Sequence, residues 1–210
     1  MTSLVIVDSG SANLSSVYKA ARMVSLNPTV TDDPRVIARA DALIFPGVGS
    51  FDHAASKLSG KGLQEVLLLA IEKDRPFLGI CLGMQLLLPA SEESIETGQS
   101  GRGLAAIGGL VKKFPSGLPV PHVGWNRAKP IDGSLLFRDL EEGAYFYFTH
   151  SYYAEPDREE VILAKTEYGF SFTSAVNRGN VYGVQFHPEK SGPAGLRLLA
   201  NFGKIIADPQ

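Results

Sequence analysis

The sequence predicts an α/β fold with a mixed, largely parallel central sheet. Over the first part of the chain, short apolar runs alternate with helical patterns, which is typical of parallel strands joined by crossover helices. The later predicted strands are separated by turn residues, which favours antiparallel pairings there. Because the 210 residues contain no internal repeat and no linker, we expect one domain spanning residues 1–210.

The first part of the chain supplies the parallel strands and most of the helices. Apolar runs predict strands at Leu4–Val7, Thr29–Thr31, 42–45 and 77–80. Apolar residues spaced three and four apart predict helices at 13–24, Pro34–Arg39 and Leu63–Glu72. A further helix is predicted from residue 82 to 88, where Pro89 ends it.

The second part begins with a change of composition. Residues 91–109 are rich in Ser, Glu, Gly and Gln, which predicts a mobile loop. Strands are predicted at 111–114, 145–148, 161–166, 171–177 and 181–185. A last helix is predicted to begin near Pro193, because proline is favoured in a first helical turn and apolar residues follow at helical spacing.

Composition and charge exclude several classes of protein. No apolar run approaches the roughly 20 residues that span a bilayer, and a net charge of −2 does not favour nucleic acid as a partner. The apolar run at Leu4–Val7 lies too close to Met1 to leave room for a signal peptide. The single cysteine cannot form an internal disulfide, so we expect a cytoplasmic protein.

The sharpest chemical feature is Gly79-Ile80-Cys81-Leu82-Gly83, a G-x-C-x-G motif between a predicted strand and a predicted helix. This arrangement matches a nucleophile elbow with cysteine in place of serine. The amide groups that begin the following helix favour the thiolate. A lone cysteine is more often a buried structural residue, but the flanking glycines at this junction favour a nucleophile.

A thiolate used in acyl transfer needs a histidine, and that histidine needs a group to orient it. In Val184-Gln185-Phe186-His187-Pro188-Glu189, an extended chain would point His187 and Glu189 to the same side. The other histidines lack this carboxylate two residues on. A zinc deaminase would need two further thiols, so we expect neither a metal nor a cofactor.

Pro46-Gly47-Val48-Gly49 is a glycine-rich turn after the third predicted strand. Backbone N–H groups of Gly47, Val48 and Gly49, with that of Leu82, are candidate donors to a developing oxyanion. Glycine-rich strand ends are mostly simple turns. The position of this turn beside the elbow strand is what favours a catalytic role.

Two segments carry a family resemblance: GICLGMQ at residues 79–85 and GVQFHPEKSG at residues 183–192. Through them the chain resembles the class I, or triad, glutamine amidotransferases. The resemblance implies a three-layer, flavodoxin-like α/β fold and a Cys81 that attacks the side-chain amide of glutamine, releasing ammonia. It also implies a glutamine pocket; its residues would be Gly49, Gln85, His150, Ser151 and Tyr152.

PGVGSF, PHVGWN and FYFTHSYY, at residues 46–51, 121–126 and 146–153, resemble the branch of this family that serves histidine biosynthesis. That resemblance implies a partner, a (β/α)8-barrel cyclase subunit that receives the ammonia. It also implies an interface gate formed by Trp125, Tyr147 and Lys190. Ordinary packed aromatic residues and a solvated lysine are an equally open interpretation of these three.

Two alternatives remain at this stage. The chain could be a glutaminase that supplies a different synthase, or a non-catalytic regulatory relative that only binds a partner. The presence of the cysteine, histidine, glutamate and glycine turn together argues against the second, because a scaffold needs none of this chemistry.

Overall fold

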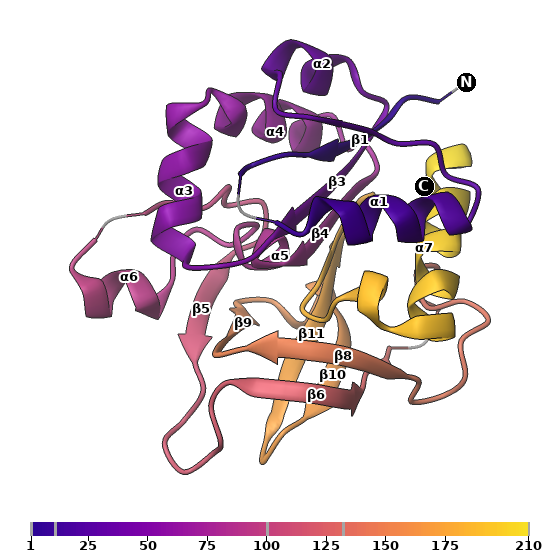
Figure 1. Cartoon of the computed structure of the whole chain (residues 1–210). Helices are drawn as coiled ribbons and strands as arrows, with labels where there is room; N and C mark the ends of the chain where they lie inside the picture. Colours follow the sequence, from indigo (N-terminus) through magenta and orange to yellow (C-terminus); the bar gives the residue numbers. More distant parts are fainter. Residues whose placement is uncertain (1, 11, 100, 132, 210) are drawn as a thin grey trace.

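The computed structural model describes residues 2–10, 12–99, 101–131 and 133–209. Within them, a ten-stranded sheet forms the middle of the molecule (Figure 1). Its strands are β1 (Leu4–Val7), β2 (Thr29–Thr31), β3 (Ala42–Gly47), β4 (Phe77–Cys81), β5 (Gly109–Lys113), β7 (Lys129–Pro130), β9 (Tyr152–Pro156), β10 (Ile162–Glu167), β11 (Ser171–Arg178) and β12 (Val181–Val184). The main path runs β2-β1-β3-β4-β12-β11-β10-β7, and β9 and β5 branch from β11.

Strand direction divides the sheet into two parts. All neighbours from β2 to β12 are parallel, and the pairings from β12 outward through β11, β10 and β7 are antiparallel. In β1, β3, β4 and β12 every residue is buried, because both faces of this part are covered. The predicted mixed, largely parallel sheet is confirmed.

Helices cover both faces of the parallel part. Helices α1 (Leu14–Met23) and α7 (Gly192–Ala207) share a hydrophobic core with Ile6 and Ile44. Helices α2 (Pro34–Arg39), α3 (Phe51–Gly60) and α4 (Leu63–Glu72) share the other core with Val5 and Leu43. Successive strand residues thus point to opposite faces, and three layers result.

A second, two-stranded sheet packs beside the first. It pairs β6 (His122–Arg127) antiparallel with β8 (Tyr145–His150), and the two lie side by side in Figure 1. Strand β8 matches a predicted strand and its buried Phe146 and Phe148 join the core. The sequence did not predict β6, because its one buried position is a histidine, His122, and not an apolar residue.

Two helical predictions need correction. Helix α5 (Leu82–Gln85) is shorter than the predicted helix 82–88. The predicted mobile loop 91–109 contains α6 (Glu92–Thr97), whose first turn is capped by the Ser91 side chain. Buried Asp52 of α3 accepts hydrogen bonds from Ser94, Thr97 and the Gly101 amide, at 2.7, 3.1 and 2.9 Å, so a distant carboxylate orders this segment. Residue 100 of that loop lies outside the described residues.

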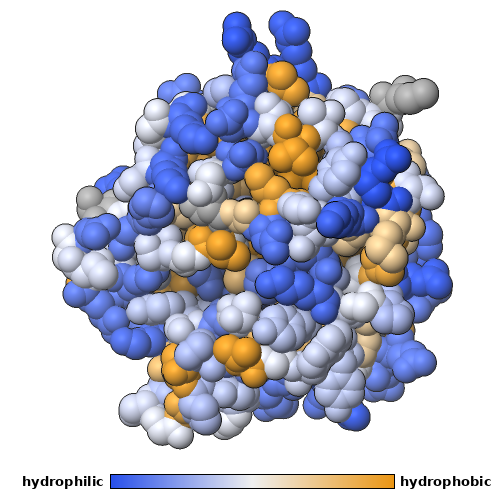
Figure 2. Space-filling view, viewed as in Figure 1, coloured by the Kyte–Doolittle hydropathy of each residue, from blue (hydrophilic) through white to orange (hydrophobic). Residues whose placement is uncertain are grey.

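A short 3-10 helix, η1 (Glu159–Val161), precedes β10. The face shown in Figure 2 is mostly hydrophilic, with separate hydrophobic groups on it. None of the described helices combines the length and apolar character needed to cross a membrane.

Gly83 allows the closest backbone approach near the fourth strand. A Cβ atom there would lie 1.8 Å from the carbonyl oxygen of Phe45 in β3, a distance that no packing adjustment of a side chain relieves. We expect Gly83→Ala to cost about 2 kcal/mol or more of unfolding free energy, measured by chemical denaturation. Gly60→Ala is the matched control, since a Cβ at Gly60 would meet nothing within 4 Å. Equal stability of the two variants would contradict the close approach.

Candidate active site

The register between two central strands brings the predicted catalytic residues to one edge of the sheet. Strands β4 and β12 are parallel neighbours, with Val184 beside Ile80. The next residue on β4 is Cys81, and the first residue after β12 is Gln185. His187 follows two residues later, so the nucleophile and the histidine leave the sheet at the same carboxyl edge.

Cys81 occupies a sharp turn between β4 and α5. Its φ is 55°, in the left-handed region that residues other than glycine rarely adopt. The flanking glycines permit the turn, because a Cβ at Gly79 would lie 2.7 Å from the carbonyl oxygen of Gly83. The predicted strand-to-helix elbow is therefore present, and Cys81 is 7% exposed at the sheet edge.

Glu189 orients the ring of His187. Its Oε1 atom lies 2.8 Å from Nδ1 of the histidine, and only 3% of either side chain is exposed. The prediction of an extended chain here is wrong, because residues 188–190 form a 3-10 turn, η2 (Pro188–Lys190). The turn still lets the carboxylate reach back to the ring, and the His187 amide donates to the Tyr147 carbonyl of β8 at 2.9 Å.

The second ring nitrogen of His187 is available for proton transfer. Nε2 is buried and has no hydrogen-bond partner within the described part of the chain. No hydrogen bond of ordinary geometry joins it to Cys81, yet the sulfur is close enough to act on the ring. Burial lowers the pKa of His187, but the nearby Cys81 sulfur and the hydrogen-bonded, negatively charged Glu189 outweigh burial and raise that pKa to about 10.

The glycine-rich turn follows the strand on the other side of β4. Gly47 of β3 pairs with Cys81, and a Cβ at Gly47 would lie 3.0 Å from the Leu82 Cβ. The turn thus packs against the elbow, as predicted. Gly49 has a φ of 103°, a conformation that strains any other residue. Whether these amides and that of Leu82 bind an oxyanion stays a prediction.

A pocket of about 360 Å³ opens over the sulfur. It contains the predicted pocket residues together with the nucleophile and part of the glycine turn. Its lining consists of Val48, Gly49, Cys81, Leu82, Gln85, Glu93, Pro121, Thr149, His150, Ser151 and Tyr152. Two larger hollows among the described residues contain neither Cys81 nor His187, so their size does not make them candidates for this chemistry.

Two of the predicted pocket residues have their polar atoms engaged inside the protein. The Gln85 side-chain nitrogen donates to the Tyr152 carbonyl at 3.0 Å and to Gln185 Oε1 at 3.1 Å. Both ring nitrogens of His150 are also within hydrogen-bond distance of protein atoms, Nδ1 at 2.7 Å from the Tyr152 carbonyl and Nε2 at 3.1 Å from His122 Nδ1. These side chains shape the pocket, and His150 would meet a ligand through its ring face or backbone.

Glu93 is a pocket residue that the sequence analysis missed. It lies on α6, inside the segment predicted to be a loop, and its Oε2 accepts a hydrogen bond from the Phe51 amide at 2.7 Å. The contact joins α6 to the first turn of α3, which follows the glycine turn. A capping serine followed by acidic residues, Ser91-Glu92-Glu93, was the available signal for a helix here.

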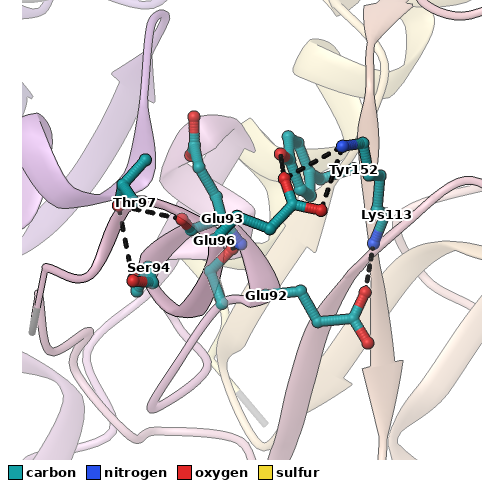
Figure 3. A network of polar contacts seen from close by, with 8 residues as sticks. Glu92, Glu93, Ser94, Glu96, Thr97, Lys113 and Tyr152 are labelled. Carbon is teal, nitrogen blue, oxygen red and sulfur yellow. Dashed lines mark hydrogen bonds and ion pairs between the residues drawn. The ribbon is translucent and has the colours of Figure 1, made fainter.

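Figure 3 shows how α6 is attached to the opposite wall of the pocket. The Tyr152 hydroxyl donates to Glu96 at 3.1 Å, and the Lys113 ammonium lies 2.9 Å from the same carboxylate. The Lys113 amide also donates to Glu92 at 2.8 Å. Helix α6 therefore bridges the pocket mouth between α3 and the β5–β9 pair.

The three predicted gate residues lie together beside the histidine turn. The rings of Trp125 on β6 and Tyr147 on β8 have centroids 6.2 Å apart, and the Lys190 ammonium lies 5.8 Å from the Tyr147 ring centroid. Trp125 is 56% exposed, which is unusual for so large an apolar side chain. Their role as a gate is untested.

Metal ions are held by sets of ligating side chains that lie close together. Among the residues the structure describes, no three His, Cys, Asp or Glu side chains are grouped so that they could hold a metal ion.

Comparisons with known proteins show which family this chain resembles over nearly its whole length. The sequence model of the family "Glutamine amidotransferase class-I" matches residues 5–206. The chain is similar to "Imidazole glycerol phosphate synthase subunit HisH" of Methanothermobacter thermautotrophicus, with 47% identity over 203 residues, covering 97% of this chain and 98% of that protein. The protein of the same name from Synechocystis sp. is 48% identical over 208 residues, covering 97% of both chains.

Solved structures support the fold. The structure described as "Crystal structure of glutamine amidotransferase" superposes with a TM-score of 0.75 at 18% identity, covering 97% of this chain and 98% of that chain. A putative GMP synthase protein from Thermoplasma acidophilum gives a TM-score of 0.72 at 18% identity, covering 99% of this chain and 94% of that chain. The three-layer fold expected from the resemblance is confirmed.

The raised pKa of His187 generates a pH prediction. A raised pKa means that the protonated ring is favoured, so the ring should stay charged from acid pH up to about 10 in the folded chain. The stability that the charged His187 ring contributes to the folded chain is fully present below the pKa of the unfolded chain, about 6.5. It is lost as pH rises through the pKa of the folded chain. We expect NMR titration of the imidazole in Glu189→Gln to give a lower pKa, because the neighbouring negative charge is gone.

Glu96→Gln, which removes a half-exposed carboxylate that makes no contact with His187, is the control and should leave the His187 titration unchanged. A His187 ring that titrates near 6.5 in the unaltered chain would contradict the arrangement.

Proposed function

Since the chain belongs to the class-I glutamine amidotransferases, we propose that it is the glutaminase subunit of an imidazole glycerol phosphate synthase, which hydrolyses glutamine to glutamate and ammonia. The observation that carries the chemistry is the buried His187–Glu189 pair, which follows β12, the strand beside the one that ends at Cys81. The observation that favours this synthase is the identity of 43–48% to curated subunits of that name over nearly the whole chain.

The first half of the reaction forms a thioester. With the Cys81 proton held on Nε2 of the charged His187 ring, the Cys81 thiolate attacks the side-chain amide carbon of glutamine. Negative charge develops on the amide oxygen, where the amides of Gly49 or Val48 and of Leu82 would donate to it. The imidazolium returns its proton to the nitrogen as the carbon–nitrogen bond breaks, so ammonia leaves and a glutamyl thioester remains.

The second half reverses these roles. His187 Nε2 takes a proton from water, the hydroxide adds to the thioester carbon, and the carbon–sulfur bond breaks. Glutamate leaves and the sulfur receives the proton again. Throughout, Glu189 accepts from Nδ1–H, which keeps Nε2 facing the sulfur and stabilises the charged ring.

The pocket has the chemistry to hold an amino acid. With its side-chain amide at Cys81, the α-ammonium and α-carboxylate of glutamine would lie toward the pocket mouth. Glu93 is the acidic lining residue, and we expect it to pair with the α-ammonium group. Backbone groups around Ser151 and Tyr152 supply polar atoms for the other end.

The name of the relatives implies a partner subunit, and we propose that this partner is a (β/α)8-barrel cyclase. The cyclase would use the ammonia to convert a phosphoribulosyl formimino intermediate into imidazole glycerol phosphate and an aminoimidazole carboxamide ribotide. Exposed apolar side chains on the β6–β8 pair support a docking surface beside the active site; they are Val123, Trp125 and Tyr145. Ammonia would pass between Trp125, Tyr147 and Lys190.

We further propose that activity is low until the partner and its ligand bind. The glycine turn must present an amide to the oxyanion, and Gly49, with its φ of 103° and open surroundings, is a natural pivot. Residues 1–210 would act as one domain. A single cysteine suits the reducing cytoplasm.

Removing the nucleophile is the direct test. We expect Cys81→Ala to lower the rate of glutamine hydrolysis by about 10³-fold or more, because no thioester can form. The assay measures glutamate released with and without the cyclase and its substrate analogue. Ser59→Ala, on the exposed end of α3, is the control and should keep the activity. Stimulation by a different synthase but not by this cyclase would assign the chain to another pathway.

The docking surface has its own test. We expect Trp125→Ala to weaken binding to the cyclase subunit by about tenfold or more, since buried tryptophans are frequent interface hot spots. Met23→Ala is the control, because Met23 is 72% exposed on α1 and lies outside the β6–β8 pair. Calorimetric titration compares the two; equal affinities would place the partner elsewhere.

A further inference from the structure

Gln185 lies closer to the nucleophile than its place in the sequence suggests. It follows β12 directly, where the register sets it beside Cys81, and it is completely buried. Its side-chain nitrogen lies 3.7 Å from the Cys81 sulfur, and its side-chain oxygen lies 3.1 Å from the Gln85 nitrogen. The reaction described above assigns no role to this side chain.

A backbone carbonyl determines which end of the Gln185 amide faces the sulfur. The Tyr152 oxygen can only accept, so the Gln85 group that lies 3.0 Å from it must be its NH₂ group. The second hydrogen of that group is then available to Gln185, whose nearest atom must be its oxygen. The NH₂ group of Gln185 consequently faces Cys81.

The same carbonyl orients a pair of neutral histidines. His150 Nδ1 must donate to the Tyr152 oxygen, which leaves Nε2 to accept from His122 Nδ1 at 3.1 Å. Asn126 then donates to His122 Nε2 at 3.3 Å. Burial lowers the pKa of His122 to about 4 and that of His150 to about 3, so both rings stay uncharged at neutral pH and the chain of donors keeps one direction.

We propose that Gln185 is a further catalytic residue: its side-chain N–H donates to the Cys81 sulfur and stabilises the thiolate. Gln85 is the positioning residue that holds the Gln185 oxygen. The assignment deepens the proposed glutaminase function and rests on it for its role in turnover.

The chemistry favours a neutral amide at this position. A hydrogen bond to an anion is stronger than one to a neutral group, so the donor stabilises the thiolate more than the thiol or the thioester. It therefore helps twice, when the thiol gives its proton to His187 and when the thiolate leaves the thioester carbon. An amide does not titrate, so it cannot compete with His187 for the proton.

Two substitutions separate the donor from the rest of the side chain. Gln185→Met keeps the length and removes both polar atoms. Gln185→Glu keeps an oxygen for Gln85 and replaces only the NH₂ group that faces the sulfur. Ser174→Ala is the matched control on the adjacent strand β11, because Ser174 is also buried, its carbonyl pairs with the Gln185 amide, and its hydroxyl has no partner among the described residues.

The measurement is the pH dependence of Cys81 alkylation by iodoacetamide in the full chain, followed by mass spectrometry. The chain has one cysteine, so the label reports this thiol alone. We expect the midpoint to rise by about one pH unit in Gln185→Met, the size of a hydrogen bond to a charged group, and by more in Gln185→Glu. With the cyclase subunit present, kcat for glutamine should fall about tenfold in Gln185→Met. Ser174→Ala should match the unaltered chain.

A midpoint in Gln185→Met equal to that of the unaltered chain would overturn the proposal, because a purely structural role would change stability without changing the thiol. If Gln185→Met does not fold, Gln185→Leu takes its place, because it also removes the donor without adding a charge. The two proposals can fail separately, because alkylation requires no glutamine. If the unaltered chain hydrolyses no glutamine, the proposed function is refuted. The contact between Gln185 and the sulfur is still decided by the pH dependence of alkylation.

Discussion

The parallel pairing of β4 with β12 is the constraint on which the site depends. These strands are adjacent in the middle of the sheet although about a hundred residues separate them in the chain. Their register sets Gln185 beside Cys81 and brings His187 out at the same edge. If β12 slipped by one residue along β4, each of its side chains would point to the opposite face of the sheet. Both strands are buried on both faces, so this register is fixed, and it keeps the catalytic side chains together.

Close backbone packing at this edge explains the glycines around the nucleophile. The elbow fits only because Gly79 and Gly83 let the turn approach itself and β3. With α5 only four residues long, the helix contributes little of a dipole to the sulfur. The Cys81 thiolate depends instead on two side chains. One is the charged His187 ring, whose pKa is raised by Cys81 and Glu189 despite burial. The other is the side-chain amide of Gln185, which faces the sulfur.

The parts of the molecule outside the parallel sheet connect this chemistry to its surroundings. Strand β8 holds the His187 backbone through Tyr147 and carries His150 at the pocket wall. Its partner β6 exposes Trp125 and contributes His122 to the neutral histidine pair. One small sheet therefore exposes apolar side chains outward and lines the pocket inward, so that binding at the proposed docking surface would have a direct physical connection to the reacting groups.

Sequence alone determined the local features of this protein. Continuous apolar runs predicted β1, β3, β4 and β12, since strands buried on both faces need such runs, and the flanking glycines identified the Cys81 turn. The identities of His187 and Glu189 also followed from the sequence, although the geometry did not: an extended chain was expected and a 3-10 turn joins them.

Tertiary structure decided the features that depend on distant partners. Helix α6 forms because buried Asp52 binds it, Glu93 becomes a pocket residue through that helix, and the direction of the Gln185 amide is set by the Tyr152 carbonyl. Such contacts join residues far apart in the chain, where neither periodicity nor local propensity carries information about them.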